Sequence, residues 1–581
     1  MLKTLRIALA CLLLGAGIAS AQVVPGEPSL TPKSAAPAPL LRLAPKAVPS
    51  GARLAPVSDI ELQRLRETNR SSVARKRIAI GIERAVARGL QGATVDRWNA
   101  VAGGFAAQGS LTSSGADAMR ISIDLANVPS DVEMVFFGSD APDVLVGPVR
   151  VGDVKDRSVP WWGPITDGET QTVEFFSRTR AGAVSVRLAG ASHVFTTVAS
   201  GFTKLTQDIG TSGSCNVDIK CSSLQTSQAF LDARSAVAEM VFNDASHTFL
   251  CTGTLLNDTA PSTQIPWFLS ANHCFENENP PLKTSSQMQT VANTLTTLWA
   301  FEAQSCGSRN VPPYSQLVGG AQFIYNNSRA DVLFLRLNDA APPGAFFAGW
   351  SANSLDAGVS VITIHHPEGD LKKVSQASTI GTNNPPVPGG NALSFTEVRY
   401  SSGTTEPGSS GAALFTFDGS QYLVRGALWG GTALCTNPTG TDSYSRLDNV
   451  YSSLQPYLSS SSGPAYDFTD LWWNPSESGW GLNLIQHPNG IIFAIWYTYD
   501  TNGKMTWYHL PSGTWTDSMT YTGTLYAVAG PAFTANPFNA SMVKRTPVGS
   551  ATLSFTGSSS GTWSYSVDGA SGSKPISRLP F

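Results

Sequence analysis

The sequence has no excess of charge of either sign and few charged residues overall. Its 581 residues contain 39 lysines and arginines against 42 aspartates and glutamates, and charged residues make up 14% of the chain. Such a balance produces no global electrostatic field that would recruit a polyanion. Nucleic-acid binding is therefore excluded as a primary function.

Apolar runs long enough to cross a bilayer are also missing, because none reaches roughly 18 uninterrupted residues. The short apolar run at 7–14 follows Lys3 and Arg6 and precedes the small residues 19–21. This pattern is typical of a secretory signal peptide, residues 1–21, that is removed after export. We therefore expect a secreted, extracellular protein without a transmembrane segment.

Cysteine is scarce and confined to one part of the chain. Cys11 lies in the predicted signal peptide, and the other six cysteines are Cys215, Cys221, Cys251, Cys274, Cys306 and Cys435. An even number in an exported protein predicts three disulfides, but six cysteines allow 15 pairings and their spacing does not choose among them. The region from 215 to 435 is therefore expected to form one oxidised domain.

Length and composition divide the chain into several units, since one domain usually takes roughly 100–200 residues. Residues 22–57 are rich in proline and alanine, with eight prolines between 22 and 56 and almost no aromatic residues. We expect this segment to be extended and poorly ordered.

A helix is expected next, because Ser58 and Glu61 have capping-box spacing. The helical pattern continues to the basic run Arg75-Lys76-Arg77, which we interpret as a solvated helix face in preference to a partner contact. Short alternating apolar and polar runs from about 95 to 203 predict a small antiparallel β domain. Residues 58–209 are thus expected to form an α+β unit.

The rest of the chain is predicted to be all-β. Residues 210–456 combine short strands, many turn residues and the six cysteines, which favours a β-barrel domain. A Ser/Gly linker is expected at 457–465. Residues 466–581 hold seven of the 14 tryptophans and are predicted to form a separate β module. These tryptophans are interpreted as core, with a stacking platform for a ligand as the alternative.

The segment "TEPGSSGAALF", residues 405–415, places two serines between glycines directly before an apolar run. A serine hydroxyl becomes a useful nucleophile only when a base takes its proton and a third group orients that base. A nucleophile in this segment therefore requires a histidine and an acid elsewhere in the chain.

Both partners have candidates. His273 ends the strand-like run in "WFLSANHCF", beside a cysteine that would pin its backbone. Asp331 opens the alternating segment "ADVLFLRLN", where a buried carboxylate would need a donor such as an imidazole N–H. The chain order His273, Asp331, Ser410 is the order found in chymotrypsin-type double β-barrels.

Five collinear motifs carry a more specific resemblance. They are "SGSCNVDIKC" (212–221), "CTGTLLN" (251–257), "SANHC" (270–274), "ITIHHP" (362–367) and "TEPGSSG" (405–411). Together with the six cysteines, they resemble the secreted bacterial lysyl endopeptidases, a chymotrypsin-fold family of serine proteases. The likeness covers roughly 210–456 and implies a double β-barrel protease domain that needs neither cofactor nor metal.

The resemblance implies a role for each candidate. Ser410 matches the nucleophile, His273 the general base and Asp331 the group that orients the base. The backbone N–H groups of Gly408 and Ser410 match the oxyanion hole, and glycine suits position 408 because a Cβ obstructs the turn that aims its amide. The implied disulfides are Cys215–Cys435, Cys221–Cys306 and Cys251–Cys274.

The same resemblance suggests a substrate pocket. In "DSYSRL", Asp442 matches the family's pocket-base aspartate, although a solvent-facing turn aspartate is the alternative. Trp429, Gly430 and Gly431 would line the pocket and pair with an extended substrate. The family pattern has a histidine at position 429 and a tryptophan before the serine motif, and no tryptophan occurs between 351 and 428. Cleavage after lysine and after arginine are therefore equally expected.

Two further positions bear on metal binding and activation. His365 and His366 lack a second ligand pair at metal-site spacing, which favours packing over a metal site. Ser409 stands where trypsin has an aspartate that pairs with the freed N-terminus. Serine cannot form that ion pair, so activation is expected to depend on removal of the propeptide, 22–209, which would assist folding and cover the active site. The mature chain would begin after Lys204 or after Ile209.

The expected protein is a secreted serine endopeptidase, made as a proenzyme, that cuts protein or peptide substrates after Lys or Arg through an acyl-enzyme. Its own propeptide would be its second partner. The alternative is an inactive or non-enzymatic binding protein whose Trp-rich module binds a polymer or a cell-surface ligand.

Overall fold

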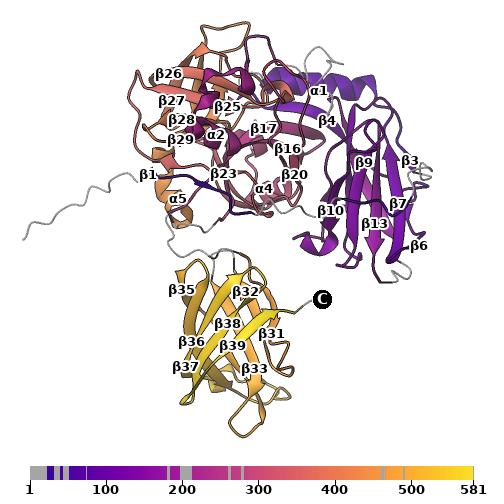
Figure 1. Cartoon of the computed structure of the whole chain (residues 1–581), viewed down its shortest axis with the longest axis vertical. Coiled ribbons are helices and arrows are strands. Elements are labelled where there is room, and N and C mark those ends of the chain that lie inside the picture. Colours follow the sequence, from indigo (N-terminus) through magenta and orange to yellow (C-terminus); the bar gives the residue numbers. More distant parts are fainter. Residues whose placement is uncertain are drawn as a thin grey trace, which may run out of the picture.

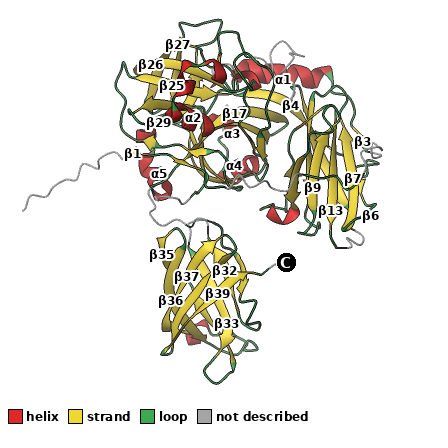
Figure 2. Ribbon diagram, viewed as in Figure 1, coloured by secondary structure: helices red, strands yellow, loops and turns green. Residues whose placement is uncertain are grey.

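The fold is mainly β and consists of an N-terminal domain, a central domain and a C-terminal barrel (Figures 1 and 2). The computed structural model describes residues 23–31, 39–43, 51–72, 75–179, 184–196, 212–259, 264–276, 281–458, 464, 466–487 and 491–579. The predicted signal peptide, residues 204–209 and most of the predicted linker lie outside the described residues. Among the described helices, none is both long and apolar enough to cross a membrane.

The N-terminal domain is a helix followed by a sandwich of two β-sheets. Its elements are α1 (Asp59–Ser72), β3 (Ala52–Arg53), β4 (Ile78–Ala85), β5 (Thr94–Val95), β6 (Asn99–Val101), β7 (Gly104–Thr112), β8 (Ala118–Asp124), β9 (Glu133–Gly138), β10 (Val146–Arg150), β11 (Trp161–Trp162), β12 (Thr166–Asp167), β13 (Thr170–Ser177) and β14 (Val186–Val194). Apolar residues of β8, such as Ile121 and Ile123, pack against Phe136 and Phe175 of the facing sheet. The period-2 alternation that predicted this domain therefore forms its core.

Helix α1 begins with the expected capping box, since the Ser58 N–H donates to Glu61 Oε2 at 2.8 Å and the Glu61 N–H donates to Ser58 Oγ. The helix ends at Ser72, and the basic run lies beyond it. The interpretation of this run as a solvated helix face is wrong, because Lys76 is 0% and Arg77 5% exposed. Their partners come from distant parts of the chain, which a local helical pattern does not reveal.

Within 22–57, the segment expected to be poorly ordered, three short strands are described. β1 (Val23–Val24) pairs with β24 (Trp350–Ser351), β2 (Glu27–Pro28) pairs with β23 (Phe346–Phe347), and β3 pairs with β7. The described strands of this segment therefore pair with strands of the central domain and of the N-terminal domain.

The central domain contains two barrels. Its strands are β15 (Val217–Asp218), β16 (Val237–Asp244), β17 (His247–Leu256), β18 (Trp267–Ser270), β19 (Thr296–Trp299), β20 (Ser315–Leu317), β21 (Ala321–Asn327), β22 (Val332–Leu337), β23, β24, β25 (Ser360–His365), β26 (Lys373–Asn383), β27 (Phe395–Ser402), β28 (Ala413–Phe417), β29 (Tyr422–Gly431) and β30 (Thr441–Tyr444). Its helices are α2 (Gln228–Ser235), α3 (Asn272–Phe275), α4 (Ser285–Ala292) and α5 (Tyr451–Leu458).

The two barrels differ in closure. In the first barrel, β17 pairs with β16 and β18, β16 continues to β19 and β20, and β18 continues to β22 and β21. In the second barrel, β25, β26, β27, β30, β29 and β28 form a closed ring. The predicted double-barrel fold is confirmed.

Strand β4 joins the N-terminal domain to the first barrel. It pairs with β14 on one side and with β17 on the other, so one sheet runs through both domains. Ile78 and Ile80 of β4 share a core with Phe242 and Phe249 of the first barrel. This pairing fixes the position of the basic residues that directly precede β4.

The C-terminal module is a closed β-barrel. Its strands are β31 (Asp470–Trp473), β32 (Gly481–Gln486), β33 (Ile492–Tyr499), β34 (Met505–Leu510), β35 (Gly513–Asp517), β36 (Thr520–Ala529), β37 (Lys544–Gly557), β38 (Ser560–Val567) and β39 (Ala570–Arg578), and pairing of β34 with β36 closes the ring. Trp472, Trp496, Trp515 and Trp563 lie in the core, as the core interpretation expects. Trp507 is 45% exposed.

Arg120 connects the N-terminal domain to the first barrel. It points away from the sandwich core and is fully buried, and it donates to Asn243 Oδ1, Thr294 O and Thr296 Oγ1 at 2.7–3.1 Å. Burial lowers the pKa of Arg120 to about 9, an effect that Glu83 opposes. The Arg120 guanidinium therefore links the two domains through hydrogen bonds.

We predict that Arg120→Met destabilises the chain. Each buried acceptor left without a donor costs about 1–3 kcal/mol, and Arg120 donates hydrogen bonds to several such acceptors. Urea unfolding of the full chain measures the loss. Arg150→Met is the control, because the Arg150 side chain is 62% exposed. Equal stabilities for the two variants would contradict a structural role for Arg120.

Candidate active site

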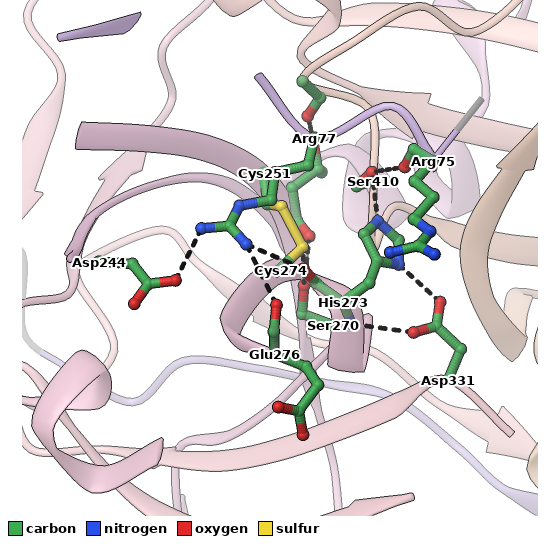
Figure 3. The surroundings of a disulfide bond; sticks show 12 residues. Arg75, Arg77, Asp244, Cys251, Ser270, His273, Cys274, Glu276, Asp331 and Ser410 are labelled. Carbon is green, nitrogen blue, oxygen red and sulfur yellow. Dashed lines mark hydrogen bonds and ion pairs between the residues drawn. A yellow bond between two sulfur atoms is a disulfide. The ribbon is translucent and has the colours of Figure 1, made fainter. Parts of the chain in front are cut away.

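Three side chains predicted from distant segments meet between the two barrels (Figure 3). His273 lies on α3, Asp331 directly precedes β22, and Ser410 lies in the loop between β27 and β28. His273 Nδ1 is 2.7 Å from Asp331 Oδ2, and His273 Nε2 is 2.7 Å from Ser410 Oγ. All three are buried, with exposures of 2%, 0% and 0%. An uninterrupted line of hydrogen bonds therefore runs from carboxylate to hydroxyl.

The surrounding backbone holds this line in place. The His273 N–H donates to Asp331 Oδ1 at 2.9 Å, so both carboxylate oxygens accept from one residue. The disulfide Cys251–Cys274 ties α3 to β17 directly beside the imidazole. Because both nitrogens of the ring have partners, its orientation is determined by hydrogen bonding on two sides.

The loop that carries Ser410 directs two backbone N–H groups to one oxygen atom. The Gly408 N–H donates to Lys76 O at 2.6 Å, and the Ser410 N–H is directed to the same oxygen at 3.4 Å. Gly408 has φ +94°, and a Cβ at this position would lie 2.6 Å from His366 O. Glycine is therefore required for the backbone that converges these two N–H groups on one oxygen.

Asp442, the predicted pocket base, lies on β30 and is 0% exposed. Its Oδ2 accepts from Lys76 Nζ at 2.6 Å and from Tyr400 Oη at 3.0 Å, and Thr405 Oγ1 also donates to it. Lys76 Nζ further donates to Ala433 O at 2.8 Å and to Thr405 O at 3.1 Å. Oxygen atoms from these residues therefore surround a single ammonium group.

Burial shapes the electrostatics of this pocket. Desolvation lowers the pKa of Lys76, while the Asp442 carboxylate opposes that change. Desolvation, with the nearby Asp442 charge, raises the pKa of Tyr400 well above its ordinary value. Tyr400 is therefore a neutral hydrogen-bond donor to the carboxylate at neutral pH.

The other predicted pocket residues lie on β29. Gly431 is next to Asp442, since a Cβ there would lie 2.6 Å from Asp442 Oδ1. Gly430 pairs with Ser443, the residue after Asp442. Trp429 is buried in a small cluster with Val387 and Phe395.

His365 and His366 have protein partners. His365 Nδ1 is 2.8 Å from Ser409 Oγ and its Nε2 is 3.1 Å from Ser375 Oγ. His366 stacks on Phe301 with ring centroids 6.0 Å apart. Within the described residues, no group of three or more His, Cys, Asp or Glu side chains is arranged to hold a metal ion.

The structure contains three disulfides between the pairs that the resemblance implies, Cys215–Cys435, Cys221–Cys306 and Cys251–Cys274. The first closes the longest loop, with a sequence separation of 220. It lies beside the loop of Ser410, because Asn216 Nδ2 and Gly213 N both donate to Glu406. Two of the three disulfides, Cys251–Cys274 and Cys215–Cys435, therefore lie beside the segments that carry His273 and Ser410.

Sequence reasoning missed Lys76, Thr405 and Tyr400 as parts of the site. Lys76 belongs to a basic run that resembles many solvated segments, and its ion pair spans 366 residues. Thr405 is the first residue of the segment 405–415, so a polar side chain within that motif was a usable signal. Tyr400 alternates along β27 with polar residues and carries no signal of its own.

Two family models match this chain. The family model "Lysyl endopeptidase, C-terminal domain" matches residues 209–445, and "Lysyl endopeptidase N-terminal domain" matches residues 53–195. A lysyl endopeptidase of Pseudomonas aeruginosa is 33% identical over 365 residues, which cover 60% of this chain and 74% of that protein.

Two solved structures of the Rv3671c protease of M. tuberculosis show weak structural similarity. The active form is 15% identical, with a TM-score of 0.27 over 44% of this chain and 91% of that one. An inactive mutant form is 13% identical, with a TM-score of 0.27 over 41% and 95% of the two chains.

The buried His365 predicts a dependence of stability on pH. Burial, reinforced by Lys76 and Lys373, lowers the pKa of His365 to about 3. An unfolded histidine has a pKa of about 6.5, so between these values the unfolded chain binds a proton that the folded chain does not. The stability that this group contributes is present above pH 6.5 and is lost as the pH falls towards 3.

We therefore expect His365→Asn to flatten the pH dependence of the unfolding free energy between pH 6 and 4 by about 1.4 kcal/mol per pH unit. Denaturant unfolding at a series of pH values measures this slope. His487→Asn, at an exposed position, is the control. Parallel curves for wild type and His365→Asn would contradict the assignment of a neutral buried imidazole.

Proposed function

Because the chain belongs to the lysyl endopeptidase family, we propose that this protease is an exported serine endopeptidase, made as an inactive precursor, that cuts protein and peptide chains after lysine. The observation that carries the proposal is the hydrogen-bonded line Asp331–His273–Ser410 beside two converging N–H groups. The three disulfides support export to an oxidising, extracellular compartment.

In the proposed reaction, Ser410 Oγ attacks the carbonyl carbon of the substrate while His273 Nε2 takes the hydroxyl proton. Asp331 accepts from the imidazole Nδ1–H, which fixes the tautomer and stabilises the imidazolium that forms. His273 then protonates the leaving amine, and an ester on Ser410 remains. Water, activated by the same imidazole, hydrolyses the ester and regenerates the hydroxyl.

The N–H groups of Gly408 and Ser410 are the proposed oxyanion hole. They meet at one carbonyl oxygen, where negative charge develops during attack. Removing one such donor in a comparable protease costs about 2.7–4 kcal/mol of transition-state stabilisation. The strict geometric requirement for glycine at position 408 supports this role.

The proposed lysine preference comes from the length of the pocket. Lys76 Nζ reaches Asp442 directly at 2.6 Å and has backbone oxygens of Ala433 and Thr405 as further acceptors. An arginine carries a planar guanidinium beyond the position of Nζ, and this fork does not match acceptors arranged around one nitrogen. The pocket base therefore favours lysine over arginine.

The N-terminal residues 22–209 are proposed as the propeptide. Lys76 fills the pocket and is completely buried there, so a substrate lysine has no place until Lys76 leaves. The propeptide is also a folding partner, because β4 adds a strand to β17. Latency and assisted folding thus follow from the same docked segment.

The C-terminal barrel is proposed to hold the enzyme near a polymeric or cell-surface ligand. Tyr497 and Trp507 are directly opposite each other on β33 and β34, and so are Tyr499 and Met505. Their exposures range from 45% to 80%. Adjacent exposed aromatic rings are a typical stacking surface.

We predict that Ser410→Ala abolishes hydrolysis of a lysine-containing peptide. Loss of the nucleophile in a comparable protease lowers kcat by about 10⁶-fold. A fluorogenic peptide assay on the secreted protein measures this. Ser420→Ala, in an exposed turn, retains wild-type activity. Hydrolysis that survives Ser410→Ala would rule out the proposed nucleophile.

We predict that Asp442→Asn lowers kcat/KM for lysine substrates. An ammonium left buried without its carboxylate costs about 3–5 kcal/mol, which is about 10²–10⁴-fold. Steady-state kinetics on paired peptides that differ only in lysine or arginine also measures the wild-type preference, expected at about tenfold or more for lysine.

The matched control is Asp356→Asn, which changes an exposed aspartate of the same domain and leaves both peptides unaffected. Equal rates for the two peptides in the wild-type enzyme would contradict the length argument. An unchanged rate for Asp442→Asn would remove this residue from the pocket.

A further inference from the structure

Lys76 is held at both ends as the residue on the acyl side of a cleavable bond. Its ammonium lies 2.6 Å from Asp442 Oδ2 at the pocket base. Its carbonyl oxygen accepts from the Gly408 N–H at 2.6 Å and faces the Ser410 N–H at 3.4 Å. The proposed specificity pocket and oxyanion hole are therefore occupied together by one residue of the same chain.

The next residue is held on the far side of the same bond (Figure 3). Arg77 Nη2 donates to Asp244 Oδ2 at 2.9 Å, and Nη1 donates to His273 O and Glu276 O at 3.3 Å. The guanidinium also lies over the Phe249 ring, 3.5 Å from its centroid. These contacts hold the Arg77 side chain against the segment that carries His273.

The chain that follows Arg77 is fixed in register on β17. β4 begins at Ile78, one residue after Arg77, and Ile78 pairs with Leu250 of β17. A shift by one residue would turn every side chain of β4 to the opposite face. The register of β4 on β17 therefore sets Lys76 against Ser410.

We propose that the Lys76–Arg77 peptide bond is a self-processing site, cut by Ser410 of the same molecule. This inference rests on the proposed function. Ser410 Oγ attacks the Lys76 carbonyl carbon, and its proton passes to His273 Nε2. The carbon–nitrogen bond to Arg77 then breaks, and His273 gives the proton to the departing Arg77 nitrogen. Water hydrolyses the ester, leaving a Lys76 carboxylate and an Arg77 amino terminus.

The structure corresponds to the uncut chain before attack. Lys76 has φ +58°, in the left-handed region that L-residues rarely adopt. Ser410 Oγ also contacts Arg75 O, one residue before the carbonyl that it must attack. The hydroxyl has to leave Arg75 O first, so the cut is slow compared with hydrolysis of a free peptide.

Cleavage here separates two parts of the propeptide. The part that ends at Lys76 loses its covalent link to β4 and can leave the pocket. The part from Arg77 onwards stays docked through β4 and the hydrogen bonds of Arg120. Opening of the pocket is therefore a separate event from release of the propeptide near residues 204–209.

The test follows the full-length chain by intact mass and N-terminal sequencing over time, at several protein concentrations. We expect a fragment that begins at Arg77, formed at a first-order rate that does not change with concentration. The Ser410→Ala chain stays intact at this bond. Lys76→Gln forms no Arg77 terminus, whereas Lys155→Gln, at a 54% exposed lysine side chain of the same propeptide, forms it at the wild-type rate.

A small lysyl peptide, assayed in parallel, separates the possible failures. A folded Lys76→Gln chain hydrolyses this peptide faster than the uncut wild type. A misfolded Lys76→Gln chain does not hydrolyse it, and the comparison of the wild-type and Ser410→Ala chains then tests the inference. If wild type cuts the peptide but never forms the Arg77 terminus, the inference is wrong and the proposed function stands. A rate that rises with protein concentration shows cutting by another copy and also overturns it. If the wild-type chain cuts neither the peptide nor its own Lys76–Arg77 bond, the proposed function fails.

Discussion

A lysine ammonium buried against a carboxylate is the contact on which the proposed precursor depends. Burial of two charges costs several kcal/mol per ion and is offset only when every remaining donor and acceptor is satisfied. Here Lys76 Nζ has Ala433 O and Thr405 O, and Asp442 has Tyr400 Oη. The pair therefore contributes position more than net stability, because only an ammonium at this distance from β4 completes the network.

In the proposed precursor, the pocket that would select substrates is also the pocket that Lys76 fills. A substrate lysine must make the contacts that Lys76 makes, and it competes with a residue tethered by β4 whose effective concentration is far higher. Specificity and latency are consequently two results of one set of oxygens. A substitution that weakens the pocket is expected to weaken both.

The central site was largely predictable because its chemistry is local to short motifs. Glycines around Ser410, the apolar run before His273 and the strand after Asp331 each limit what the residue can do. Lys76 was not predictable, because its partner lies 366 residues away and the basic run by itself resembles solvent-exposed sequence. In the C-terminal barrel, the period-2 pattern separates Trp496 from Trp507 only once it is known which face closes inward.

The hydrogen bonds of Ser409, in the loop that carries Gly408 and Ser410, bear on how latency would arise. Ser409 hydrogen-bonds to His365, whose burial keeps the imidazole neutral, and Ser409 Oγ also accepts from the Glu406 N–H. These hydrogen bonds need no newly freed amino terminus, and the N–H groups of Gly408 and Ser410 already converge in the uncut chain. An unformed oxyanion hole therefore does not keep the precursor inactive. What remains to block substrates is occupation of the pocket, so in the proposed precursor activation would be ejection of Lys76 and not refolding of the loop.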